Sequence, residues 1–198
     1  MGIPLHSPLP RSTRAAEGLP RRRWTTEEIE AAVRAGIFAD DERFELIGGE
    51  LVVMSPKGIR HENIRNELVF RWARLCPAHL KVATETPLRL AADMAPEPDV
   101  IVFPAAMKAT TVDGPSVLLV VEIADSSLAY DLATKAPIYA ANGVREYWVI
   151  DAWSLETKIH RQPASAGYTD VDAQPVSTVL TPVSAAELAI SLAGLGVE

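Results

Sequence analysis

The chain has 198 residues, of which 48% are hydrophobic, and its formal net charge is −7. These values are typical of one globular domain with an apolar core. No apolar run approaches the roughly 20 residues that a membrane helix needs, so we expect no membrane association. The single cysteine, Cys76, excludes an internal disulfide and a multi-cysteine zinc site, and we expect a cytoplasmic protein.

The charge is distributed unevenly along the chain. Residues 1–23 contain five arginines and one glutamate, a charge of +4, so the remainder carries −11. This segment is rich in Pro, Arg and Ser and is predicted to be a disordered basic tail. Residues 24–198 are predicted to form a single domain. Its acidity is unusual for a non-specific nucleic-acid binder, although carboxylates that hold metal ions would be partly neutralised.

The first part of the domain is predicted to contain a helix, a hairpin and a longer helix, over residues 25–36, 43–54 and 59–75. Thr25 and Glu28 have the spacing of a capping box at the start of the first helix. Gly48-Gly49 is typical of a hairpin turn. Apolar residues recur at helical spacing in the longer helix, at Ile64, Leu68, Trp72 and Leu75.

The second part is predicted to consist mainly of strands. They span residues 80–90, 98–103, 117–124, 146–150 and 155–161, with a helix over 131–141 and weaker patterns at 168–171 and 188–192. The strand–helix–strand order of residues 117–150 permits a parallel pair joined by a right-handed crossover. The simplest packing is an α/β fold, in which a central mixed β-sheet is flanked by helices and preceded by the N-terminal helix and β-hairpin.

Two carboxylates stand out because their surroundings are apolar. Asp99 begins a strand directly after a proline, and Glu122 lies inside the apolar segment 118–124. Burying a carboxylate is costly unless it is paired, protonated or bound to a metal. If the two strands are neighbours, both acids can face one side of the sheet, where oxygen ligands suit Mg²⁺ or Mn²⁺. The alternative is that each acid is structural, paired with an arginine or accepting backbone hydrogen bonds.

Lys135 is predicted to be the third member of this site. It lies four residues after Asp131, so the two side chains share a helical face. The helix follows the Glu122 strand directly, and its first half should lie over the end of that strand. Lys135 could there orient a water or stabilise a developing oxyanion. The alternative is an Asp131–Lys135 ion pair on the surface, which would contribute little to stability.

Together, several motifs resemble the Uma-type family of putative restriction endonucleases, within the PD-(D/E)XK nuclease superfamily. Pro98-Asp99 and Glu122 resemble the paired acids of the superfamily, and the stretch from Val121 through Asp131 to Lys135 resembles the Uma-type family more closely. Further matching segments are Trp24-Thr25, Phe44–Ile47, Gly49–Leu51, Ser55-Pro56, His61, Tyr139, Gly143-Val144, Glu146–Trp148 and Asp151. The resemblance covers residues 24–159.

This resemblance implies a restriction-endonuclease-like core in which Asp99 and Glu122 bind Mg²⁺ or Mn²⁺. The metal would activate a water and hold the scissile phosphate of DNA, while Lys135 positions that water or neutralises the developing charge. The superfamily pattern places its lysine two residues after the glutamate, where this chain has Ala124, so Lys135 is the matching residue. The superfamily also implies a homodimer whose two sites serve two strands.

Glu45 and His61 are two further candidates. Glu45 lies in a strand and either points into the site or pairs within the hairpin. His61 lies in the first turn of its helix and either contacts a phosphate, carries a proton or is solvated. The predicted function is a metal-dependent endonuclease that hydrolyses DNA. A non-catalytic binding or assembly protein is the alternative that the acidic domain favours, and hydrolysis of another phosphate ester stays open.

Overall fold

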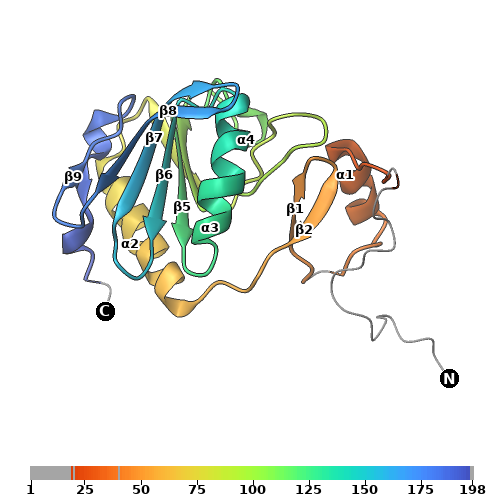
Figure 1. The fold of residues 1–198 in the computed structure, drawn as a ribbon, viewed down its shortest axis with the longest axis horizontal. Coiled ribbons are helices and arrows are strands. Elements are labelled where there is room, and N and C mark those ends of the chain that lie inside the picture. Colours follow the sequence, from red (N-terminus) through yellow and green to blue (C-terminus); the bar gives the residue numbers. More distant parts are fainter. Residues whose placement is uncertain (1–18, 20, 40, 197–198) are drawn as a thin grey trace.

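The computed structural model describes residues 19, 21–39 and 41–196 of the chain, so most of the predicted basic tail lies outside the described residues. At its centre is a mixed sheet of six strands in the order β3-β4-β5-β6-β7-β8 (Figure 1). Their bounds are β3 Leu80–Thr84, β4 Val100–Pro104, β5 Leu119–Ala124, β6 Glu146–Asp151, β7 Thr157–Ala164 and β8 Gly167–Gln174. Only β5 and β6 are parallel, and the other four pairings are antiparallel.

Helices cover both faces of this sheet. Helix α2 (Ile59–Leu75) lies on one face, and α3 (Leu128–Tyr130) and α4 (Ala136–Ala141) lie on the other (Figure 1). The hairpin β1–β2 (Phe44–Ile47 and Glu50–Val53) and α1 (Thr26–Arg34) form a small lobe on the α3 side. The C-terminal segment adds a short ribbon, β9–β10, on the α2 side. Its elements are β9 Val179–Leu180 and β10 Ile190–Ser191, flanked by 3₁₀ turns at Ala186–Leu188 and Leu192–Gly194.

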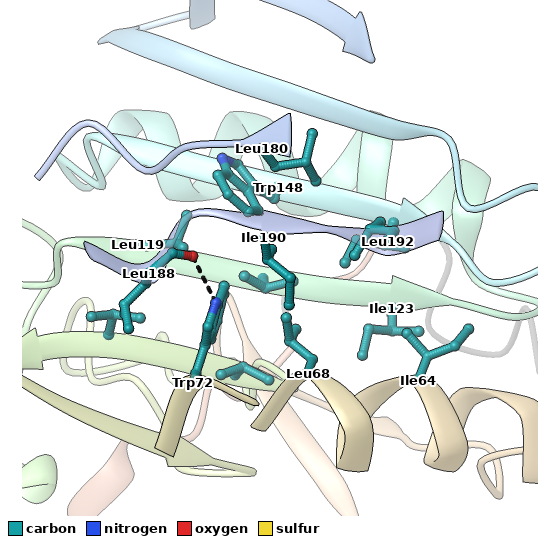
Figure 2. Close-up of a cluster of buried hydrophobic side chains, with 14 of the residues drawn as sticks. Ile64, Leu68, Trp72, Leu119, Ile123, Trp148, Leu180, Leu188, Ile190 and Leu192 are labelled. Atoms are coloured by element: carbon teal, nitrogen blue, oxygen red, sulfur yellow. Dashed lines mark hydrogen bonds between the residues drawn. The ribbon is translucent and has the colours of Figure 1, made fainter. Parts of the chain in front are cut away.

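Alternation along the strands divides the core into two clusters. On the α2 side, Leu68 and Trp72 pack against residues of β5, β6 and the C-terminal ribbon (Figure 2). The indole of Trp72 donates to the carbonyl of Leu188 at 2.8 Å, which ties the ribbon to α2. In β5, Ile123 faces this cluster, whereas Val120 and Ala124 face the cluster under α4. Because side chains alternate along a strand, Glu122 points to the α4 side.

Several elements follow their sequence predictions closely. Helix α2 has the predicted bounds, and the capping box of Thr25 and Glu28 is present at the start of α1. The last predicted position of the α2 apolar face is wrong, because Leu75 is 50% exposed, whereas Cys76 packs partly against the core. Arginines at the end of the predicted tail form ion pairs with the domain, namely Arg21 with Glu50, Arg22 with Glu28 and Arg23 with Asp93.

Two predicted elements are divided or shortened. The strand predicted over residues 80–90 ends at Thr84, because Glu85 has a left-handed backbone (φ +47°) that turns the chain. The helix predicted over 131–141 contains a π-helical segment, Asp131–Lys135, between α3 and α4. Pro137 provides the reason. Proline has no N–H to donate to the carbonyl four residues earlier, and its ring clashes with that carbonyl in a regular α-helix.

Candidate functional site

A pocket of about 300 Å³ lies between the hairpin lobe and the end of β5. It is lined by all five residues that the sequence singled out: Glu45, His61, Asp99, Glu122 and Lys135. Each of them is at most 6% exposed. The interpretation of His61 as a solvated helix-start residue is therefore wrong.

Strand pairing brings Asp99 and Glu122 to the same place. Strand β4 runs antiparallel to β5, with Val100 opposite Val121, so the residue before β4 meets the last residues of β5. One oxygen of Asp99, Oδ2, accepts the backbone N–H of Ile123 at 2.7 Å. This bond fixes the Asp99 carboxylate at the end of β5 beside Glu122.

Cationic and polar groups surround the Asp99 carboxylate. Lys57 donates to Oδ1 at 2.7 Å, and Nε2 of His61 lies 2.9 Å from Oδ2. Burial by itself would raise the pKa of Asp99, but the hydrogen bond and charge of His61 and the charge of Lys57 lower it to about 2. Asp99 is therefore held in its ionised form. The hydrogen bond that Asp99 accepts from the Ile123 N–H is also what we expect if this acid has a purely structural role.

The Glu122 carboxylate has a different environment. Its Oε1 accepts from Lys135 at 2.9 Å and from the hydroxyl of Tyr139 at 3.0 Å. Burial raises the pKa of Glu122 well above its ordinary value, Lys135 opposes this, and the charge of Asp99 adds to it. Tyr139, one of the residues that match the family pattern, is fully buried and also contacts the site.

Lys135 is the central cation of the α4 side of the pocket. Its ammonium lies 2.9 Å from both Glu45 and Glu122 and 3.9 Å from Asp131. Burial alone would lower the pKa of Lys135, but the charges of these three acids raise it. The alternative of a surface ion pair with Asp131 is wrong, because Lys135 and Asp131 are 6% and 2% exposed.

The π-helical segment positions this lysine. Asp131 and Lys135 are its two ends, and the N–H of Ala136 donates to the carbonyl of Asp131, five residues earlier. That carbonyl also accepts from the hydroxyl of Tyr147 at 3.3 Å. Single π turns inside α-helices occur often at functional sites. Here the turn places both ionisable side chains in the pocket.

Lys57 is a pocket residue that was not predicted from the sequence. It lies in the loop before α2 and contacts both Asp99 and Glu85, the latter at 3.0 Å. The following Gly58 lies against the side chain of Asp125, the residue directly after β5, so this loop approaches the end of that strand closely. No periodicity marks such a loop residue, and its partners are distant in the sequence.

The pocket contains more buried acids than buried cations. Glu45, Asp99, Glu122 and Asp131 are all buried, whereas Lys57 and Lys135 are the lysines that line it. Asp131 Oδ1 is buried without a hydrogen-bond partner among the described residues. The described residues contain no group of three or more His, Cys, Asp or Glu side chains that could hold a metal ion by itself.

Comparisons with known proteins agree on the family and the fold. The model of the Uma2 family, described as "Putative restriction endonuclease", matches residues 27–193. The chain is also similar to the crystal structure of a putative nuclease of DUF820 from Anabaena variabilis ATCC 29413. That comparison gives a TM-score of 0.67 at 16% identity and covers 86% of this chain and 96% of the other. Among curated proteins, none matches the chain.

Proposed function

Because the chain belongs to the Uma2 family of putative restriction endonucleases, we propose that its pocket is the active site of a metal-dependent endonuclease that hydrolyses DNA phosphodiester bonds. The observation that carries the proposal is the meeting of Asp99, Glu122 and Lys135 in one buried pocket, reached from three separate elements. The architecture supports it, since the six-stranded mixed sheet and its helices match the fold of the Anabaena protein. Among the described residues, no helix is long and apolar enough to cross a membrane.

The donor chemistry of the pocket fits Mg²⁺ or Mn²⁺. Mg²⁺ usually keeps several waters and is held by one or two carboxylates together with substrate phosphates, so it does not require three protein ligands. Asp99 and Glu122 would hold the ion. A divalent cation would also compensate buried negative charge that Lys57 and Lys135 leave unmatched. When bound, such an ion supplies Lewis-acid activation of a water and of the scissile phosphate.

The side chains of the pocket then have distinct roles in the proposed reaction. Lys135 neutralises negative charge that develops on the phosphoryl group, and its three acidic neighbours keep it protonated. Tyr139 and Lys135 orient the Glu122 carboxylate through Oε1. His61 and the Ile123 N–H orient Asp99. Glu45 holds Lys135 from the hairpin side and couples the lobe to the site.

The test is cleavage of plasmid DNA and of linear duplex DNA with Mg²⁺ or Mn²⁺. Activity should be lost in Asp99→Ala and in Glu122→Ala and should fall about 10²–10³-fold in Lys135→Ala. Mn²⁺ titration by calorimetry should show binding to the wild type and not to the double Asp99/Glu122 variant. Cleavage that survives both alanine substitutions would sink the proposal. Metal-independent binding without cleavage of any nucleic acid would favour a non-catalytic binding protein.

We also propose a homodimer, as the resemblance to the nuclease superfamily implies, in which two such sites serve the two strands of a duplex. The mass of the protein measured by light scattering after gel filtration tests this proposal. A monomeric mass at the concentration that supports double-strand cleavage would refute it.

A further inference from the structure

A second hollow, of about 490 Å³, lies beside the proposed active site. The two share the segment 53–57, which ends at Lys57. The second hollow is lined mainly by charged side chains, including Arg43, Arg65 and Glu85. None of these three lines the first pocket. The second hollow therefore extends the site along a charged surface beyond the proposed metal ligands.

Three cations in this second hollow converge on one carboxylate oxygen. Glu85 Oε1 lies 3.0 Å from the ammonium of Lys57, 3.2 Å from a guanidinium nitrogen of Arg43 and 2.8 Å from one of Arg65. Burial by itself would raise the pKa of Glu85, but the hydrogen bond of Lys57 and the charges of all three cations lower it to about 2. One anionic oxygen thus occupies a place built from three positive groups.

The backbone of Glu85 is held in an uncommon conformation at this position. Its φ of +47° lies in the left-handed region, which non-glycine residues adopt rarely and at a cost in free energy. The N–H of Arg65 that points to Glu85 is buried and has no well-aligned hydrogen bond among the described residues. Each arginine has a second acidic partner, Glu97 for Arg43 and Glu62 for Arg65. These partners would hold the arginines in place if the Glu85 carboxylate moved away.

We propose that Arg43, Lys57 and Arg65 form a phosphate subsite, which binds a phosphodiester next to the scissile one and exchanges it for the Glu85 carboxylate. This inference rests on the proposed nuclease function. A phosphodiester and a carboxylate each carry one negative charge, so the exchange leaves the three cations compensated. Guanidinium groups match phosphate oxygens in bidentate geometry. One ammonium, that of Lys57, contacts both Asp99 and Glu85 and so joins the subsite to the metal pocket.

Binding of a short fluorescein-labelled DNA oligonucleotide, measured by anisotropy in EDTA at several salt concentrations, tests the subsite without cleavage. Arg43→Ala should raise Kd about tenfold and lower the salt dependence by about one phosphate contact. Glu85→Gln should instead lower Kd several-fold, because it removes the competing internal anion. The side chains of Arg43 and Glu85 do not contact the carboxylates of Asp99 and Glu122, and the backbone N–H of residue 85 that donates to the Asp99 carbonyl is kept in Glu85→Gln. Mn²⁺ affinity should therefore stay unchanged in both variants.

Matched controls separate the subsite from general charge effects. Arg34→Ala removes a cation whose side chain is 71% exposed on α1, and Glu67→Gln removes an acid whose side chain is 45% exposed on α2. Both should leave Kd within twofold of wild type. Thermal unfolding monitors the fold of each variant, and Arg43, with a side chain 48% exposed, is chosen over the more buried Arg65 for this reason.

The outcomes distinguish the subsite from the nuclease function. If Arg43→Ala and Glu85→Gln match their controls, or if Glu85→Gln weakens binding, the subsite is wrong, and metal-dependent cleavage by the wild type would leave the nuclease proposal standing. If the wild type neither binds nor cleaves DNA, both proposals fail together.

Discussion

The two carboxylates of the pocket have opposite electrostatic environments. On the β4 side, Asp99 lies beside Lys57, His61 and a backbone N–H, and its pKa falls to about 2. On the α4 side, Glu122 shares the single ammonium of Lys135 with Glu45 and Asp131, and burial raises its pKa well above the ordinary value. Two acids at the ends of neighbouring strands therefore differ in how readily each loses its proton.

The difference teaches that pairing, and not burial alone, decides the state of each acid. Asp99 and Glu122 are equally buried, at 4% exposure. Only Asp99 has enough donors to offset the loss of water. A metal ion held by both carboxylates would oppose the raised pKa of Glu122, because a nearby positive charge favours the ionised form of an acid. Four changes would break or sharpen this comparison.

The largest effect is expected from Lys135→Met, which removes the only ammonium that contacts Glu122 among the described residues. Three buried acids would then lack their cation, and breaking such a buried pair destabilises a protein by about 3–5 kcal/mol. Urea unfolding at pH 7 measures the loss. Lys81→Met, at an exposed position of β3, is the control. An equal loss in both variants would show that the Lys135 cluster contributes no net stability.

A smaller effect on the free energy of unfolding, of opposite sign for Asp99 and Glu122, is expected from a change in pH. Asp99 contributes stability above its ordinary pKa of 3.8 that is lost as pH falls toward 2, about 2 kcal/mol in all. Glu122 contributes stability below its ordinary pKa of 4.5 that is lost as pH rises through its raised pKa. Asp99→Asn should therefore destabilise the protein at neutral pH and not near pH 2. Glu122→Gln should change little near pH 4 and stabilise at higher pH. If the free energy of unfolding, measured in EDTA, depends on pH in the same way for both variants, the comparison is contradicted.

Lys57→Met should be milder than Lys135→Met, with a loss of about 1–2 kcal/mol. Its partners keep other donors, because Asp99 still contacts His61 and Glu85 still contacts two arginines. Urea unfolding of both methionine variants under identical conditions measures the two losses of unfolding free energy, which can then be compared directly. If Lys57→Met is as costly as Lys135→Met, Asp99 is no better supplied with hydrogen-bond donors than Glu122.

The smallest effect is expected from Tyr139→Phe, which removes a 3.0 Å hydrogen bond to Glu122 and leaves the ring in place. The loss should be about 1 kcal/mol, because one buried hydrogen bond is broken while Lys135 still donates to the same oxygen. Tyr168→Phe, whose hydroxyl donates to the carbonyl of Val144, is a matched control outside the pocket. A gain in stability would show that Glu122 needs no second donor.

Much of the fold followed from local patterns. Residues 59–75 repeat apolar side chains at helical spacing, and α2 begins and ends at those residues. Periodicity failed where one residue overrides its neighbours. Glu85 ends β3 through its backbone conformation, and Pro137 is associated with a π turn in a segment that otherwise reads as one helix. Neither effect changes the apolar pattern from which the elements were predicted.

The sequence by itself determined which side chains are costly to bury, since acids inside apolar strands need compensation wherever they lie. Asp99, Glu122 and Lys135 could be selected on that basis and on the family resemblance. Only the tertiary structure decided what compensates each of them. The antiparallel register of β4 and β5 places Asp99 on the Ile123 N–H, and the π turn places Lys135 between Glu45 and Glu122. Lys57 contacts partners 28 and 42 residues away, and such contacts depend on how separate elements pack and not on the local spacing of residues.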